Sequence, residues 1–376
     1  MNIVVHCVYF PPEVGGLESH VHYLCRGLVA RGHRVTVVTS LSRPGLPRFE
    51  IMDGIHIHRT VLPARKPWGW FVHAAGSTGR TRELVQDADV VHAQAFPSLL
   101  PCALALAGTD TPLVCTLHTS HFLRLAANPV VRGSLGKLIE LSDHNFAASK
   151  EIADVGEGLN DSVSVEVVVN GVDTGVFAPV PGSVPRDENR HRLVVPRRLF
   201  PKNGVEFFVR ALPVILAGVD VDVIVIGDGP ERERLEGLAA ALGVAARIDF
   251  LGARLHAEMP ALLSSADLAV FPSLVEATSV AALESMACGL PVAASAVGGL
   301  PEIIDDDVGG LFAPGDPEAL AAGVLKLLAS PDGLRERGIA ARERVVARWS
   351  NERLVDRHLD VYRQLAGRRH RHREES

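Results

Sequence analysis

Two glutamates in the segment 272–291 lie in surroundings that do not suit a free carboxylate. Glu284 stands in a run of small and apolar residues (AALESMAC), with no cationic residue three or four positions away along the chain. An ionised carboxylate in such surroundings needs a hydrogen-bonding partner from elsewhere, and a ligand hydroxyl can supply it. Glu276 lies eight residues earlier. We therefore expect both glutamates to contact a polar ligand; the alternative is that both are solvated.

The helix that carries Glu284 has recognisable ends. Thr278 or Ser279 can cap its start, and Gly289 ends it. The amides of its first turn, near Thr278, Ser279 and Val280, would attract a phosphate, because a helix N-terminus presents free N–H groups and a positive dipole end. Both glutamates can face one ligand if Glu276 lies on the loop before the helix.

A basic segment, RRLFPKNG at 197–204, begins at the end of an expected strand at 193–199 and leads into an expected helix at about 204–217. Arg198 and Lys202 could hold a diphosphate without a metal ion. Each charge-assisted hydrogen bond of this kind contributes roughly 1.5–3 kcal/mol. The alternative is a solvated basic turn.

A glycine pair follows the first apolar run. Gly15 and Gly16 stand between that run (residues 2–8) and a helical pattern at about 17–31. Because glycine has no side chain, the backbone at this turn can approach a ligand closely. Glu18 would stabilise the first helical turn through the helix dipole even without a functional role.

A second glycine turn, GDGP at 227–230, makes Gly229 a candidate nucleotide contact. The full dinucleotide fingerprint is missing from it, which argues against an NAD-dependent dehydrogenase. The P-loop pattern G-x-x-x-x-G-K-[ST] is also missing from the sequence, which argues against a P-loop NTPase.

His118 ends an expected strand at 112–118 and is a candidate polar residue of the site. The alternative is a core or surface histidine. With His121 it makes a weak metal pair, because no further ligand is evident. The aspartates at 305–307 precede a glycine pair and are typical of a solvated turn. We therefore expect no metal and no cofactor.

The elements that position these residues form two similar sets. Apolar runs without polar alternation predict parallel strands that are buried on both faces. These runs occupy residues 2–8, 35–40, 88–94, 112–118, 193–199, 222–227, 247–252, 268–273, 291–295 and 309–314. The fold class is thus α/β, with two Rossmann-like, doubly wound parallel-sheet domains. Ligands bind at the carboxyl ends of the strands in such sheets, so two lobes would face a central cleft.

The domain limits follow from composition. We expect an N-terminal domain over 1–177, a linker rich in proline and charge over 178–192, and a C-terminal domain over 193–349. An amphipathic helical pattern covers 340–366, and the tail 367–376 (GRRHRHREES) lacks core residues, so we expect it to be disordered.

Composition limits the function classes. Lysine and arginine number 38 against 44 aspartates and glutamates, a net charge of −6, which argues against a nucleic-acid partner bound by a broad basic surface. No apolar stretch is long enough to cross a bilayer. The first ten residues predict a strand rather than a signal peptide. Five scattered cysteines indicate reduced thiols and a cytoplasmic protein.

The segment RKPWGWF at 65–71 mixes cations with aromatic residues. One hypothesis is a surface loop that contacts the inner face of a membrane as a peripheral protein, or a lipid-linked acceptor. The alternative is a folded-over loop with partly buried tryptophans, and a small soluble acceptor is equally open.

Six motifs, taken together and in their order along the chain, resemble one family over about residues 1–365. PSLVEATSVAALESMACGLPVAASAVGGLPEII resembles the E-x7-E signature of family 4 glycosyltransferases, which are retaining enzymes of the GT-B fold that use nucleotide sugars. VPRRLFPKNG resembles their phosphate motif, and VIVIGDGPERE and RIDFLG match the next two strands. FPPEVGGLESHV and VVNGVDTGVFAP match the N-terminal glycine loop and an interdomain element.

The resemblance implies roles for the second half of the chain. Glu276 contacts hydroxyls of the transferred sugar, and Glu284 binds the ribose of a UDP or GDP sugar. Arg198 and Lys202 stabilise the leaving diphosphate. Lys202 lies one position early, because Asn203 stands where the family has lysine. The family's glycine- and phenylalanine-containing stretch is replaced here by ATSV at 277–280.

The resemblance also implies roles for the first half. Gly16 lies behind the phosphates, His118 lies near the reacting carbon and the acceptor, and the helix 350–366 crosses back to the first domain. The predicted activity is metal-independent, retaining glycosyl transfer from a nucleotide-diphosphate sugar to an acceptor hydroxyl. A nucleotide-sugar 2-epimerase of the same architecture and an inactive nucleotide-sugar-binding module remain alternatives.

Overall fold

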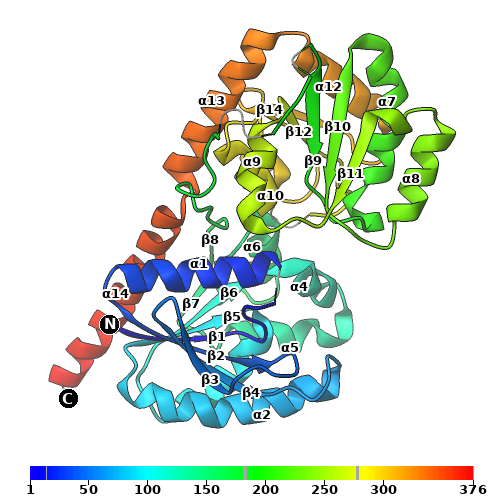
Figure 1. Cartoon of the computed structure of the whole chain (residues 1–376). Coiled ribbons are helices and arrows are strands. Elements are labelled where there is room, and N and C mark those ends of the chain that lie inside the picture. The colour runs from blue at the N-terminus through cyan, green and yellow to red at the C-terminus, as the bar shows by residue number, and fades with distance from the viewer. Residues whose placement is uncertain (14, 181–183, 188, 277–278, 376) are drawn as a thin grey trace. The chain divides into compact units, whose positions relative to one another are not determined.

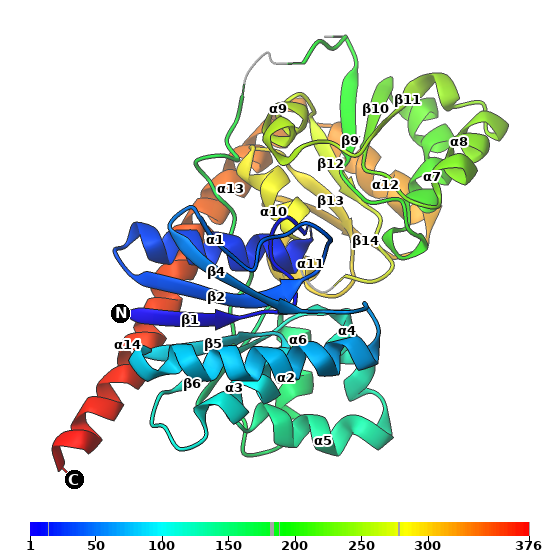
Figure 2. The ribbon, with the colours of Figure 1, turned by 60° about the horizontal axis from the view of Figure 1, so that its bottom comes forward.

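The computed structural model describes residues 1–13, 15–180, 184–187, 189–276 and 279–375. The chain divides into two compact units (Figures 1 and 2). Unit 1 comprises Met1–Gly171 and Asn351–Ser376, and unit 2 comprises Val172–Ser350. The boundary lies earlier than the expected residue 177, so the expected linker 178–192 belongs to unit 2.

Contacts explain why part of this segment joins unit 2. The Val180 amide donates to Ser264 Oγ at 3.0 Å, and Arg186 Nη1 donates to Asp267 Oδ1 at 2.9 Å. Polar anchors of this kind cannot be recognised from the composition that suggested a linker.

In the described part of unit 1, eight strands form one sheet in the order β3-β4-β2-β1-β5-β6-β7-β8. The strands are β1 (Asn2–His6), β2 (Arg34–Leu41), β3 (Phe49–Met52), β4 (Ile55–Val61), β5 (Val90–Gln94), β6 (Leu113–Leu117), β7 (His144–Ala147) and β8 (Val165–Val167). All pairs are parallel except β3 with β4. The strand order reverses between β1 and β5, which creates a switch point where ligands bind in such sheets.

Helices cover both faces of this sheet, with α1 and α2 on opposite faces (Figures 1 and 2). They are α1 (Gly16–Ala30), α2 (Pro67–Leu84), α3 (Leu99–Leu106), α4 (Thr119–Ala126), α5 (Pro129–Ile139), α6 (Lys150–Glu157) and α14 (Asn351–Glu375). The segment at 65–71, expected as a loop, therefore contains the start of α2.

Helix α14 belongs to the core of unit 1. Val355, Leu359 and Tyr362 are buried in the same apolar cluster as Ile3 and Leu24. The Tyr362 hydroxyl lies 2.5 Å from His92 Nδ1, and Arg31 of α1 pairs with Asp356 at 2.8 Å.

The end of the chain differs from the sequence prediction. The helical pattern at 340–366 is two helices, because α13 ends at Arg348 and α14 begins at Asn351. Helix α14 then continues to Glu375, through the tail expected to be disordered. Extending an existing helix needs no core residues, and the arginines and glutamates of this tail have high helix propensity.

In the described part of unit 2, six parallel strands form a sheet in the order β11-β10-β9-β12-β13-β14. They are β9 (His191–Val195), β10 (Val221–Ile226), β11 (Ile248–Gly252), β12 (Leu268–Phe271), β13 (Val292–Ser295) and β14 (Gly309–Phe312). The helices are α7 (Val205–Gly218), α8 (Arg232–Ala241), α9 (Met259–Ser264), α10 (Val280–Ala287), α11 (Leu300–Ile303), α12 (Pro317–Leu328) and α13 (Pro331–Arg348).

The unit 2 sheet also has a switch point, between β9 and β12. Buried apolar residues of β9, β10, α7 and α12, including Phe208, Leu212 and Val324, form its core. The predicted class of two doubly wound α/β domains is confirmed, and the switch point selects the loops after β9 and β12 as the place to look for a ligand site.

Candidate functional site

Four loops at the carboxyl edge of the unit 2 sheet are held together through glycines. A Cβ atom at Gly204 (φ +64°) would lie 1.9 Å from the Pro272 carbonyl oxygen, and one at Gly298 (φ +53°) would lie 1.6 Å from that of Glu276. A side chain at Gly229 would meet the Leu199 carbonyl at 2.3 Å. Only glycine fits at such distances, so the loops after β9, β10, β12 and β13 share one packed edge.

Gly229 thus has a packing role that needs no ligand. The Asp228 carboxylate accepts from the Gly229 amide at 2.8 Å, and the Leu199 amide donates to the Asp228 carbonyl at 3.0 Å. These contacts place the GDGP turn against the basic turn after β9, where the sequence analysis expects a nucleotide.

An ion pair joins the loops after β9 and β12. Arg197 Nη2 lies 2.5 Å from Glu276 Oε2 and 2.9 Å from Asn203 Oδ1. The side chains of Arg197 and Glu276 are only 11% and 15% exposed. The Arg197 guanidinium also lies 5.7 Å from the centre of the Phe271 ring. The Glu276 carboxylate is therefore oriented by Arg197 and nearly enclosed.

Arg197, which is not among the residues predicted for the site, contacts Glu276, and its predicted neighbour Arg198 does not. The Arg198 side chain is exposed and lies over the Phe200 ring at 5.7 Å. Lys202 is exposed too, and its carbonyl accepts from the Leu274 and Val275 amides at 2.8 and 3.3 Å. Arg198 and Lys202 thus remain on the predicted edge with solvent-facing charges, while Arg197 makes the contact with Glu276.

Asn203 explains how the basic turn keeps this arrangement. It is buried, accepts from Arg197, and donates from Nδ2 to the Arg198 carbonyl at 2.6 Å. Asn203, which stands where the resembled family has lysine, therefore holds the turn in place.

Glu284 has a partner within the chain. His256 Nε2 lies 3.0 Å from Glu284 Oε1, and the Glu284 side chain is 11% exposed. The hydrogen bond to Glu284 raises the pKa of His256 above its ordinary value, against the opposing effect of burial. Because Glu284 is isolated in the sequence, it is expected to have a partner from elsewhere. The structure supplies that partner from within the chain, as His256 in the segment before α9.

The start of α10 lies beside Glu276 in the sequence. Ser279 caps α10, because its hydroxyl accepts from the Ala282 amide at 3.3 Å, and Val280 is the first helical residue. Gly289 follows the helix with φ +81°. Thr278 lies outside the described residues. The predicted helix limits are confirmed, and Ser279 uses its hydroxyl for the cap.

In unit 1, Gly15 and Gly16 lie at the carboxyl edge beside the switch point. A Cβ at Gly15 would lie 2.3 Å from Glu18 Oε2, whereas one at Gly16 would have no described atom within 4 Å. Gly16 is the first residue of α1 and borders open space. This is the geometry expected of a backbone that a ligand can approach.

His118 follows β6 and is buried, with 3% exposure. Its Nε2 lies 2.8 Å from Gln94 Oε1, at the end of β5, and its ring lies 4.9 Å from that of His20. Burial lowers the pKa of His118 to about 3, so the imidazole is neutral. Gln94, which fixes this ring, is a second residue that the sequence analysis missed.

The residues discounted as metal ligands have other partners. Arg344 pairs with Asp305 at 2.7 Å and with Asp307 at 3.2 Å. His121 stacks on Phe96 and lies 2.6 Å from an Arg124 nitrogen. Among the residues that the structure describes, no group of three or more histidine, cysteine, aspartate or glutamate side chains could hold a metal ion.

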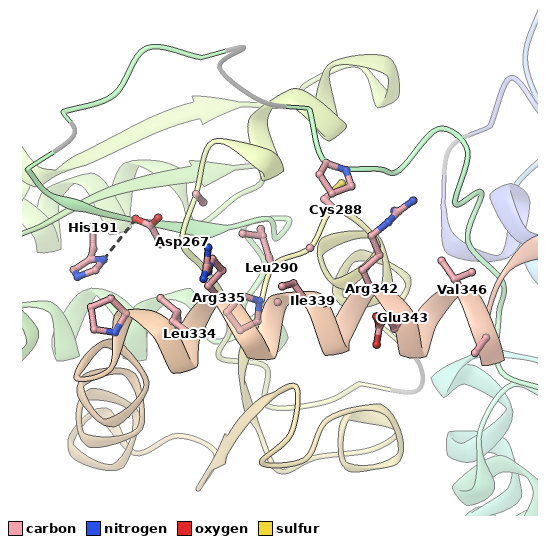
Figure 3. A pocket seen from close by; sticks show the side chains of 17 residues that line it. His191, Asp267, Cys288, Leu290, Leu334, Arg335, Ile339, Arg342, Glu343 and Val346 are labelled. Carbon is pink, nitrogen blue, oxygen red and sulfur yellow. Dashed lines mark ion pairs between the residues drawn. The ribbon is translucent and has the colours of Figure 1, made fainter.

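A cavity of about 780 Å³ in unit 2 lies elsewhere (Figure 3). It is lined by Asp267 and Pro291, which precede β12 and β13, and by Leu334 and Ile339 of α13. It therefore opens at the amino edge of the sheet. The residues predicted for the site do not line it.

Within the described residues, no helix is both long enough and apolar enough to span a membrane.

Comparisons with known proteins agree with the fold. A sucrose-phosphate synthase from Thermosynechococcus elongatus superposes with a TM-score of 0.84 at 24% identity, over 97% of this chain and 98% of that chain. The Anabaena HepE structure in complex with UDP and glucose superposes with a TM-score of 0.77 at 19% identity, over 96% of this chain and 99% of that chain. These likenesses establish the GT-B architecture.

The sequence comparisons establish the family. Residues 14–176 match the family described as Glycosyltransferase Family 4, and residues 179–344 match Glycosyl transferases group 1. A GDP-mannose-dependent alpha-(1-6)-phosphatidylinositol monomannoside mannosyltransferase from Mycobacterium tuberculosis is 30% identical over 94% of this chain and 96% of its own length. The chain therefore belongs to the family 4 glycosyltransferases and is a glycosyltransferase.

Proposed function

We propose that this enzyme transfers a sugar from a nucleoside diphosphate sugar to an acceptor hydroxyl, with retention at the anomeric carbon and without a metal ion. The observation that carries the proposal is the Arg197–Glu276 pair at the switch point of the unit 2 sheet, with Arg198 and Lys202 beside it. The relative from Mycobacterium tuberculosis depends on GDP-mannose, and HepE was solved with UDP, which supports a UDP or GDP donor.

The donor's diphosphate would lie against the exposed charges of Arg198 and Lys202 and the N-terminus of α10. Arg197 adds a third cation to this edge. Cationic side chains and helix amides fixed in place stabilise the charge that develops as a diphosphate leaves, which is the role a divalent cation plays in other transferases.

The two glutamates would hold the two sugars of the donor. Glu276 is oriented by Arg197, so its carboxylate can accept hydrogen bonds from hydroxyls of the transferred sugar. Glu284 is oriented by His256 and would accept from the ribose hydroxyls. Each carboxylate is nearly buried, which makes such hydrogen bonds stronger than in water.

The transfer step breaks the bond between the anomeric carbon and the diphosphate oxygen. The acceptor oxygen forms the new bond on the same face, and its proton passes to the departing phosphate oxygen. The chain then contributes mainly positioning and electrostatic stabilisation. His118, neutral at physiological pH, would orient groups near the reacting carbon rather than carry a charge.

The acceptor is either a small soluble molecule or a lipid-linked one. Trp68 is 54% exposed and Phe71 is 75% exposed on α2, which supports contact with a lipid surface. Trp70 instead donates from Nε1 to the Tyr9 hydroxyl at 3.3 Å.

The first experiment is a thermal-shift screen with UDP-, GDP-, ADP- and dTDP-sugars. A ligand at 100 times its Kd raises the stability by about 2.7 kcal/mol. Transfer by the best donor is then followed by NMR, with and without EDTA. Retention predicts that a donor with an axial bond at the anomeric carbon gives a product with an axial bond at the same carbon. Metal independence predicts that EDTA leaves the rate of transfer unchanged. An inverted product, loss of activity that Mg²⁺ restores, or an epimerised donor in the absence of acceptor would each contradict it.

A further inference from the structure

Three loops at the carboxyl edge of the unit 1 sheet bring two arginines to one carboxylate. Glu13 follows β1, Arg43 follows β2 and Arg65 follows β4. Because β1, β2 and β4 are neighbouring parallel strands, their following loops lie at the same edge. A cavity of about 440 Å³ opens there, lined by residues 41–46 and 61–65.

Both guanidinium groups converge on the same oxygen. Arg43 Nε lies 2.8 Å and Arg65 Nη2 lies 2.6 Å from Glu13 Oε1. Arg43 Nη2 lies 3.4 Å from Glu13 Oε2. Two planar guanidiniums aimed at one anionic group are the arrangement by which proteins recognise carboxylates and phosphates.

The two arginines of the cluster are open to solvent, whereas the glutamate between them is not. The hydrogen bond from Arg43, together with that from Arg65, lowers the pKa of Glu13 to about 2, so Glu13 is ionised. Glu13 and, more weakly, Glu18 raise the pKa of Arg65, so a second carboxylate also acts on this pair of arginines. The Glu13 side chain is 10% exposed, whereas those of Arg43 and Arg65 are 50% and 53% exposed. The enclosed carboxylate and the open guanidiniums favour a second anion on the solvent side.

Two contacts besides the one with Glu13 hold the Arg65 side chain in place. Its guanidinium lies over the Tyr9 ring at 5.1 Å, and its Nη2 also lies 3.4 Å from the Ser42 carbonyl oxygen. The Tyr9 hydroxyl in turn accepts from Trp70. A preorganised cation of this kind loses little conformational entropy when it binds a ligand.

We propose that the cavity bordered by Arg43 and Arg65 binds an anionic group of the acceptor, a phosphate or carboxylate, which takes over guanidinium N–H groups that now contact Glu13. This assignment rests on the proposed function, because it names the acceptor class for the same transfer. It requires the acceptor to be an anion, either a soluble sugar phosphate or the headgroup of an anionic lipid.

Calorimetry with inorganic phosphate tests the site directly. The titration is done on protein saturated with the nucleotide that binds best, so that the donor site is filled. We expect phosphate to bind, and Arg43→Gln and Arg65→Gln to weaken that binding about tenfold or more, the loss expected for one charge-assisted contact. Arg48→Gln is the matched control, because Arg48 is exposed on the same loop and does not line the cavity.

Glu13→Gln separates a binding role from a structural one. If the ligand competes with the Glu13 carboxylate, removing this charge tightens phosphate binding several-fold, whereas a purely structural cluster would lose affinity in all three variants. Circular dichroism checks that each variant folds. Phosphate affinity that is equal in wild type, Arg43→Gln and Arg65→Gln, or lost in Glu13→Gln, overturns the proposal.

Two further probes distinguish the sources of the anion. Glycerol 3-phosphate represents the soluble class, and vesicles of phosphatidylglycerol, compared with phosphatidylcholine alone, represent the lipid class. Binding that depends on Arg43 and Arg65 in either arm supports the proposal and names the source. Failure of every nucleotide to bind would instead refute the proposed function, while the phosphate titration without nucleotide would still decide this site.

Discussion

Arg197 and Glu276 come from loops after two adjacent strands, β9 and β12, and their side chains meet at 2.5 Å while almost enclosed. A surface ion pair contributes little, but an enclosed pair that is also held by Asn203 and Phe271 fixes the direction of the carboxylate. The glutamate is therefore preorganised to accept hydrogen bonds from a sugar that enters this edge.

Replacement of Arg197 should impair the transfer step. We expect Arg197→Gln to lower kcat/KM by about 10–100-fold, because Glu276 loses its orienting partner and the edge loses a cation. Steady-state transfer assays measure this. Arg197→Lys should recover only part of the activity, since lysine lacks the planar fork. Arg210→Gln, on the exposed face of α7, should behave as wild type; equal activity of Arg197→Gln and Arg210→Gln would reject the role.

Arg198 and Lys202 should act on the diphosphate rather than on the sugar. We expect Arg198→Ala and Lys202→Ala each to weaken binding of the nucleoside diphosphate about tenfold, and to change binding of the monophosphate much less. Calorimetry with UDP and UMP, or GDP and GMP, gives both values. Lys326→Ala, exposed on α12, is the control. An equal loss for the mono- and diphosphate in the two site variants would contradict this assignment.

Buried histidines should make unit 1 sensitive to acid. Burial lowers the pKa of His118 to about 3 and that of His358 to about 4. Between these values and the ordinary 6.5, the unfolded chain binds protons that the folded chain does not. Stability is therefore present above pH 6.5 and falls as the pH decreases, by about 1.4 kcal/mol per pH unit for each such histidine.

Urea unfolding between pH 7 and pH 5 measures this slope. Tryptophan fluorescence in a Trp349→Phe background reports unit 1 alone, since the two remaining tryptophans belong to that unit. His358→Phe should reduce the slope relative to this background. A stability that is independent of pH in this range would show that these histidines are not neutral in the folded protein.

The exposed aromatic residues of α2 should determine any membrane contact. We expect the protein to co-sediment with anionic vesicles, and Trp68→Ser with Phe71→Ser to release it, because both side chains can enter the interfacial region. Leu255→Ser removes a similarly exposed apolar side chain from unit 2 and is the control. If the wild-type protein does not sediment with the vesicles, the predicted contact with a lipid surface is wrong.

Much of the fold can be predicted from the sequence because its central strands are buried on both faces. β1, β5 and β6 are mostly apolar and lack a regular polar alternation, and strands of this kind are easy to recognise. β4 is not among the predicted strands because it is not an apolar run: its buried and partly exposed residues alternate, as in a strand near the sheet edge. Pairing with the antiparallel β3 covers one side of it, and that pairing leaves no local signal in the sequence.

The site was only partly predictable. Arg197 and Arg198 are adjacent arginines that follow the same strand. The sequence therefore does not show which of the two side chains points toward β12. The direction depends on Asn203 and Phe271, which are brought there by the fold. The partner of Glu284 was hidden for a similar reason, because His256 lies 28 residues away in sequence.

The most direct test of the account is a crystal structure of the enzyme with its preferred nucleoside diphosphate. The prediction is that the two phosphates lie at the carboxyl ends of β9 and β12, within hydrogen-bonding distance of Arg198 or Lys202, with the ribose near Glu284. A nucleotide bound instead in the cavity beside α13, at the opposite edge of the sheet (Figure 3), would contradict the account.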